Sequence, residues 1–150
     1  MLQARYTRAR TILTAVLVLT IISGAIADFG FMHASNDGWP PHAKFHALWN
    51  VWHITGTHGL ALAVFWLDMN LDKHVQIRLA TLIHLALAVS FFISMATATV
   101  WGASVHPDIP VADRPPTLFG IDGNVLGFLL ATPLVVWAWL SVERTRSNPG

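Results

Sequence analysis

Four apolar runs, each close to the length that crosses a bilayer, constrain the fold of this chain more than any other feature. They cover residues 11–28, 43–67, 79–101 and 118–142. A transmembrane helix needs about 20 consecutive, mostly apolar residues. Inside lipid every backbone amide needs a hydrogen-bond partner within the protein, and a helix supplies these partners within one segment. The sequence therefore predicts an all-α integral membrane protein, a four-helix bundle in a single domain.

The composition supports a membrane protein and excludes several classes of function. Hydrophobic residues make up 54% of the 150 residues and charged residues 11%, whereas soluble proteins carry about 25% charged residues. The net charge is +1, so no basic surface is available to bind nucleic acid. Because the chain has no cysteine, disulfides, thiolate catalysis and cysteine-ligated metals are excluded. Metal or acid–base chemistry therefore depends on the eight histidines, with Asp, Glu and Asn.

The positions of Lys and Arg predict the orientation in the membrane. Seven lie in the N-terminal segment, between the second and third runs, or in the C-terminal tail, and only Lys44 and Arg114 lie elsewhere. Since cytoplasmic loops are enriched in Lys and Arg, we expect both termini in the cytoplasm and the stretches WPPHAKFH (39–46) and HPDIPVADRPP (106–116) outside. The expected location is a bacterial inner or plasma membrane.

The first run also has the features of a signal peptide. Basic residues precede it, and Ala25-Ile26-Ala27 has the form of a cleavage site. Because the sequence retains this run, we count it as the first of four spans.

A polar stripe is predicted along the second helix. Pro40 and Pro41 suit the first turn of a helix, where no backbone N–H is needed. At about 100° per residue, a set of mostly polar side chains then falls within an arc of about 100°. The set is His42, His46, Trp49, Asn50, His53 and Thr57. Polar groups on one face of a span usually face the bundle interior or a wet cavity, so we expect this helix to line a pocket open to the outside.

Polar side chains also gather where the other runs meet the outer side. They are Asp28, His33, Asn36 and Asp37 after the first run, His106 and Asp108 after the third, and Asp122 and Asn124 at the start of the fourth. An acidic group at this depth is costly unless it is paired or functional. For Asp122 the alternative is a carboxylate stabilised by the dipole at a helix N-terminus. This convergence predicts a functional site at the outer end.

Acid–base catalysis on a lipophilic small molecule is the first chemistry that suits these residues. Imidazoles and carboxylates whose pKa values are separated by their environments can move a proton between two positions of a substrate. The candidates for catalysis are His46 and His53, with Asp28 or Asp122 to orient or relay. The candidates for substrate binding are Asn36, Asn50 and Asn124, together with Trp39 and Trp49, which alternatively anchor the helices at the membrane interface.

A metal centre is the second possibility. His42 and His46 share one helical face, a spacing that can chelate Zn, Fe or Cu, and His33 and His106 could complete the ligands. Haem b binding is a third possibility. The haem would be held by His84 of the third run and by His58 or His53 of the second run. In antiparallel spans, however, His84 is expected at the level of residue 62 rather than 58.

The segment from residue 27 to residue 46 resembles an uncharacterised family of small four-span membrane proteins. The first outer loop of that family reads approximately D-x-N-x-T-H-x-x-N-P-x-W-P-P-H-A-R-F-H. The resemblance is carried by Asp28, His33, Asn36 and the core Trp39-Pro40-Pro41-His42-Ala43-Lys44-Phe45-His46. The chain departs from the pattern at Gly30, Met32, Asp37 and Lys44. The resemblance implies that these residues form one motif at the outer end, and it implies no particular reaction.

The sequence thus favours a small membrane enzyme that isomerises, cyclises or opens the ring of a lipophilic molecule by His/Asp proton transfer, without a cofactor. The alternatives are a metal-dependent enzyme using the same histidines and a haem b-binding subunit. A non-catalytic assembly protein, with histidines forming interhelical hydrogen bonds, is a further alternative. The expected partners are the bilayer and the substrate, with a homo-oligomer as an option.

Overall fold

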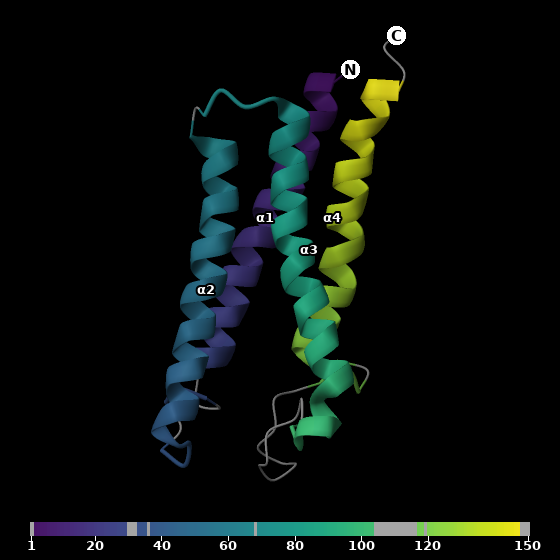
Figure 1. Ribbon diagram of the computed structural model, residues 1–150. Helices are drawn as coiled ribbons and strands as arrows, with labels where there is room; N and C mark the ends of the chain where they lie inside the picture. Colours follow the sequence, from purple (N-terminus) through teal and green to yellow (C-terminus); the bar gives the residue numbers. More distant parts are fainter. Residues whose placement is uncertain are drawn as a thin grey trace.

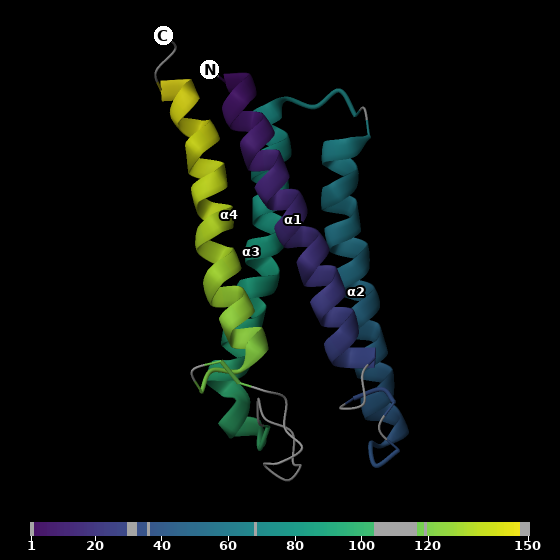
Figure 2. The same ribbon diagram turned by 180° about the vertical axis from the view of Figure 1, so that it is seen from behind.

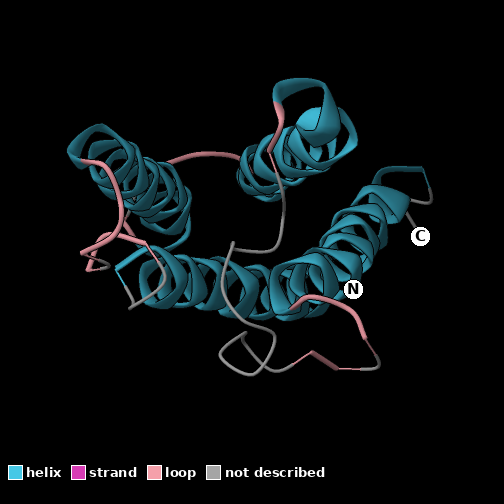
Figure 3. Ribbon diagram, turned by 90° about the horizontal axis from the view of Figure 1, so that it is seen from below, coloured by secondary structure: helices cyan, strands magenta, loops and turns pink. Residues whose placement is uncertain are grey.

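The structure of the protein is a computed structural model with four long helices. This structure describes residues 2–29, 33–35, 37–67, 69–103, 117–118 and 120–147, and no side chain beyond residue 145. The helices are α1 (Leu2–Phe29), α2 (Pro41–Trp66), α3 (Lys73–Thr97) and α4 (Gly123–Ser147), with a short 3-10 helix, η1 (Ala98–Trp101), after α3 (Figure 1). Helices and connecting loops account for all the described residues (Figure 3). The predicted all-α fold is confirmed.

The helices run antiparallel to their neighbours along the chain, so both termini lie at one end of the bundle (Figure 1). We call this the terminal end, and we call the other the loop end. The helix α1 crosses the bundle obliquely. It starts beside α3 and α4 at the terminal end and finishes beside α2 at the loop end (Figure 2). The loop end carries the connections from α1 to α2 and from α3 to α4.

Three helices are long and apolar enough to cross a membrane. They are the segments Leu2–Phe29, Lys73–Trp101 and Gly123–Thr145. Their surfaces expose large apolar side chains such as Leu19, Ile26 and Ile93, as lipid-facing helices do. The helix α2 is not among the three, because the polar side chains along it lower its mean hydropathy. The membrane character of the chain therefore rests on α1, α3 and α4.

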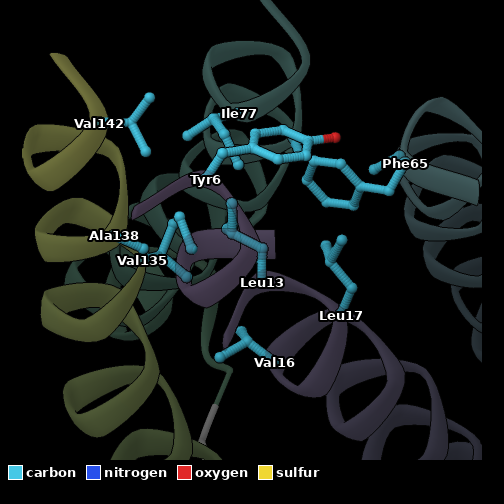
Figure 4. Packing of buried hydrophobic residues seen from close by; sticks show 12 residues of the cluster. Tyr6, Leu13, Val16, Leu17, Phe65, Ile77, Val135, Ala138 and Val142 are labelled. Atoms are coloured by element: carbon cyan, nitrogen blue, oxygen red, sulfur yellow. The ribbon is translucent and has the colours of Figure 1, made fainter. Parts of the chain in front are cut away.

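The buried core lies at the terminal end. Side chains of all four helices point into it, including Leu13 and Leu17 from α1, Phe65 from α2, Ile77 from α3 and Val135 from α4 (Figure 4). Alanines are completely buried among them on each helix, namely Ala9, Ala61, Ala80 and Ala138. Small residues let helix backbones approach closely, and this packing drives helix association in membranes.

Polar contacts add to the core at the same end. Arg78 of α3 donates to a carboxylate oxygen of Glu143 of α4 at 2.8 Å. The indole of Trp139 donates to the same oxygen at 3.1 Å. Between α1 and α2, the guanidinium of Arg10 lies 4.4 Å above the ring of Trp66. Apolar packing and interactions between charged and polar side chains therefore both hold the helices together at the terminal end.

The helix α4 begins at Gly123 rather than near residue 118, where the apolar run starts. Leu118 and Ile121 pair in a tight turn, with Gly120 at a φ of 77°, a conformation that favours glycine. The carboxylate of Asp122 then accepts a hydrogen bond from the backbone N–H of Asn124 at 2.8 Å. This bond satisfies one of the free donors at the helix start.

We expect Ala9→Leu to destabilise the bundle by about 1–3 kcal/mol, because extra methylenes in a filled core force helices apart. Ala4→Leu is the matched control, since Ala4 lies on the exposed side of the same helix. The free energy of unfolding of both variants in mixed micelles measures the effect. Equal stability of the two variants would show that the close helix contact at Ala9 is unimportant.

Candidate functional site

A cavity of about 470 Å³ lies between the four helices toward the loop end. Polar side chains on its wall come from each long helix and from the loop after α1, and they are Thr20, Ser23, Asp28, His33, Asn50, Ser90, Ser94 and Asn124. Ile54, Leu87, Phe91 and Phe128 form much of its apolar wall. A cavity of this size, mostly apolar with a few polar groups, is typical of a small-molecule site.

The cavity exists because packing is uneven along the bundle. The core and the Arg78–Glu143 ion pair hold the helices together at the terminal end. Toward the loop end, α1 lies beside α2 and away from α4 (Figure 2). The wall there carries small residues such as Gly24, Ala27 and Ser94, which leave space between the helices.

Asp28, Asn50 and His33 form a connected polar group on the cavity wall. The amide of Asn50 donates to one carboxylate oxygen of Asp28 at 2.7 Å. Nδ1 of His33 lies 3.8 Å from the other oxygen of Asp28 and 2.8 Å from the carbonyl oxygen of Ala27. Because a carbonyl only accepts, Nδ1 carries the proton and donates it to Ala27. A neutral His33 therefore keeps its lone pair on Nε2, where it can act as a base.

Trp39 holds the His33 ring from the side. The two ring centroids are 4.7 Å apart, and the planes are nearly perpendicular, at 89°. This edge-to-face contact is a favourable geometry for aromatic rings. Of the motif residues, the structure thus places Asp28 and His33 on the cavity wall and Trp39 against the His33 ring, while Asn36 lies outside the described residues.

His42 and His46 meet at the start of α2, as their spacing predicts. Their Nε2 atoms are 3.0 Å apart, and both side chains are exposed. At this distance one Nε2 donates and the other accepts. Within the described ranges, no group of three or more His, Asp or Glu side chains is placed to hold a metal ion. His106, a predicted fourth ligand, lies outside those ranges.

The polar stripe of α2 flanks the cavity. Asn50 lies on the cavity wall, while His46, Trp49 and His53 are exposed and are not among the cavity-lining residues. Seen down the helix axis, His46 and His53 are rotated by about 40° and 60° from Asn50, away from the inward side of Ile54. Both histidines therefore lie beside the cavity rather than inside it.

The two candidates at the start of α4 have different surroundings. Asn124 lines the cavity, whereas the carboxylate of Asp122 caps the helix. This hydrogen bond supports the interpretation of Asp122 as a carboxylate that stabilises the N-terminus of α4. A capping carboxylate is engaged with the backbone and is the weaker candidate for proton transfer.

The sequence reasoning missed the hydroxyl groups on the cavity wall. Ser90 and Ser94 are four residues apart on α3, and Thr20 and Ser23 are close together on α1. Ser90 and Thr20 each donate to a carbonyl oxygen of their own helix at 2.8 Å. Their oxygens can still accept a hydrogen bond from a ligand. The signal that could have identified Ser90 and Ser94 was their spacing on one helical face within an apolar run.

A second histidine pair lies deeper in the bundle. His58 of α2 and His84 of α3 are completely buried, and their ring centroids are 5.9 Å apart. The expected offset between these two levels is therefore not observed. Phe128 lies between this pair and the cavity, since it lines the cavity and its ring centroid is 6.1 Å from that of His84.

Comparison of the chain with protein-family models, with curated proteins and with solved structures finds no match.

We expect a coupling energy of about 2 kcal/mol between Asp28 and Asn50, because a hydrogen bond to a charged group contributes about 1.5–3 kcal/mol. A double-mutant cycle of Asp28→Ala and Asn50→Ala, read from unfolding in mixed micelles, isolates this energy. A second cycle with Asp28→Ala and Asn124→Ala is the control. A coupling near zero in the first cycle would contradict the Asp28–Asn50 contact.

Proposed function

We propose that this protein is a membrane enzyme that binds a small lipophilic molecule in the cavity and shifts a proton between two of its positions. The observation that carries the proposal is the Asp28–His33 pair on the wall of a mostly apolar cavity. Isomerisation, cyclisation and ring opening all fit this chemistry, because each needs proton transfer and no external oxidant or reductant.

His33 is the proposed base and acid. Its Nε2 lone pair takes a proton from the substrate and returns it at the second position, so the enzyme ends unchanged. While His33 holds the proton, the carboxylate of Asp28 stabilises the imidazolium from 3.8 Å. The hydrogen bond from Asn50 keeps this carboxylate in place.

Asn124 and the cavity hydroxyl groups are the proposed substrate-binding groups. The Asn124 amide can donate to a carbonyl oxygen of the substrate, where negative charge develops during proton abstraction. The apolar side chains Ile54, Leu87 and Phe128 suit a hydrocarbon skeleton. This wall disfavours a highly charged substrate, since a charge moved from water to apolar surroundings loses its solvation. His46 and His53, beside the cavity, are proposed to meet the substrate as it enters.

We also propose that α2 is a fourth span and that both termini are cytoplasmic, in a bacterial inner or plasma membrane. The helix α2 has 26 residues, which cover roughly 39 Å at about 1.5 Å each. Its buried side packs against α1 and α3, so its polar stripe flanks the cavity rather than interrupting the core. The excess of Lys and Arg at the terminal end supports the orientation.

Single cysteines test this topology directly, because the chain has no native cysteine. We expect a membrane-impermeant maleimide to label Asp37→Cys in intact cells and to label Met69→Cys only after the membrane is opened. Both positions are exposed, at opposite ends of α2. Labelling of both from the outside would contradict a membrane-spanning α2, and the reverse pattern would contradict the orientation.

We expect His33→Gln to lower turnover by about 10²–10⁴-fold, the usual contribution of general acid–base catalysis. Untargeted mass spectrometry of membrane extracts, from cells with and without the protein, identifies the product. Ser94→Trp, which fills the cavity, should also abolish the product, whereas Asp37→Asn, at an exposed loop position, should not. A product that persists in His33→Gln would refute the role of His33. If no extract differs between cells with and without the protein, the catalytic proposal fails.

A further inference from the structure

His58 and His84 form a buried pair of imidazoles that the proposed reaction does not use. Both side chains have no exposed surface, and their rings lie 5.9 Å apart at an interplanar angle of 76°. Nε2 of His58 and both ring nitrogens of His84 are buried without a hydrogen-bond partner in the part of the chain that the structure describes. A buried polar atom without a partner is destabilising, so such a cluster points to a missing partner.

Thr57 and the backbone of Ile54 both favour a proton on Nδ1 of His58. The Thr57 hydroxyl lies 2.8 Å from the carbonyl oxygen of His53 and donates to it. Its oxygen therefore accepts from Nδ1–H of His58, 3.3 Å away. This leaves a lone pair on Nε2 of His58, and neutral His84 also has one lone pair. Although neutral His84 also carries one N–H, no hydrogen bond joins the two rings among the described residues. The lone pairs of both imidazoles are therefore available to a shared ligand.

We propose that His58 and His84 bind one monovalent copper ion, Cu(I), in a linear two-nitrogen site. Two imidazoles bound to one ion at the usual metal–nitrogen distance of about 2.0 Å would have centroids roughly 6 Å apart, close to the 5.9 Å observed. The interplanar angle is compatible with this site, because a ring can turn about its metal–nitrogen bond without changing that distance.

The surroundings favour Cu(I) over a divalent ion. Structural zinc takes four ligands and catalytic zinc three with a water, but no third His, Asp or Glu joins the pair among the described residues. Moving an ion out of water costs several kcal/mol, and this cost grows with the square of the charge. A single charge and two neutral imidazoles, which suit copper, therefore match a buried site that has the ring of Phe128 and the hydroxyl of Thr57 among its neighbours.

The test uses the full chain, purified in detergent without a histidine tag and loaded with Cu(I) under reducing, anaerobic conditions. We expect one Cu(I) per chain to remain after challenge with a Cu(I) chelator. X-ray absorption should show two nitrogen ligands. No retained copper, or a spectrum with sulfur or with more than two strong ligands, would overturn the proposal in favour of a bridging water.

Matched variants locate the ion. We expect His58→Gln and His84→Gln each to lose the copper, whereas the double variant His42→Ala/His46→Ala, which removes the exposed pair, should keep it. Copper that persists in both buried variants would overturn the proposal. Circular dichroism checks that the variants fold, and the X-ray absorption of the wild type decides the question if they do not.

The variant Thr57→Val tests whether Thr57 orients the His58 ring toward the ion. Removing the hydroxyl should weaken Cu(I) affinity by about 10–100-fold, the usual cost of losing a group that orients a ligand. Thr57→Ser should restore the affinity, because it keeps the oxygen that accepts from His58. An unchanged affinity in both Thr57→Val and His58→Gln would overturn the assignment of Nε2 of His58 as a ligand.

Discussion

Close packing of the helices at the terminal end is the interaction on which the rest of the structure depends. Completely buried alanines on all four helices allow the backbones to approach, and Leu13 and Leu17 fill the space between them. Lipid is as apolar as these side chains, so association here depends on contact between well-fitting surfaces. Because the core that joins all four helices lies at this end, α1 can cross the bundle obliquely and leave a cavity toward the other end.

The cavity and the buried histidine pair occupy successive levels of the same bundle. Asp28, His33 and Asn50 lie at the outer part of the cavity, Ile54 lies one helical turn deeper, and His58 one turn beyond that. Asp28 and Asn50 are hydrogen-bonded at the cavity wall, whereas Nε2 of His58 and both ring nitrogens of His84 are buried without partners among the described residues. The two levels therefore differ in their polar surroundings, and we propose a different role for each.

Much of the site was predictable because helical periodicity and loop position restrict where side chains can lie. The proximity of His42 and His46 follows from their four-residue spacing, and the structure confirms it. The grouping of Asp28 with Asn50 follows from their position at the same end of adjacent helices. The position of His53 beside the cavity depends instead on the rotation of α2 about its axis. Packing against the neighbouring helices determines that rotation, so it cannot be predicted from the periodicity of α2 alone.

The sequence by itself determined that the chain is helical and suited to a bilayer, because long apolar runs in lipid must satisfy their own backbone hydrogen bonds. It also excluded disulfides and thiolate chemistry, since cysteine is absent. Only the tertiary structure decided that His33 and Asp28 share a cavity wall, and that His58 and His84 meet in the interior. These contacts join different segments of the chain, and they depend on the oblique crossing of α1 and the relative heights of α2 and α3, which arise from packing among all four helices.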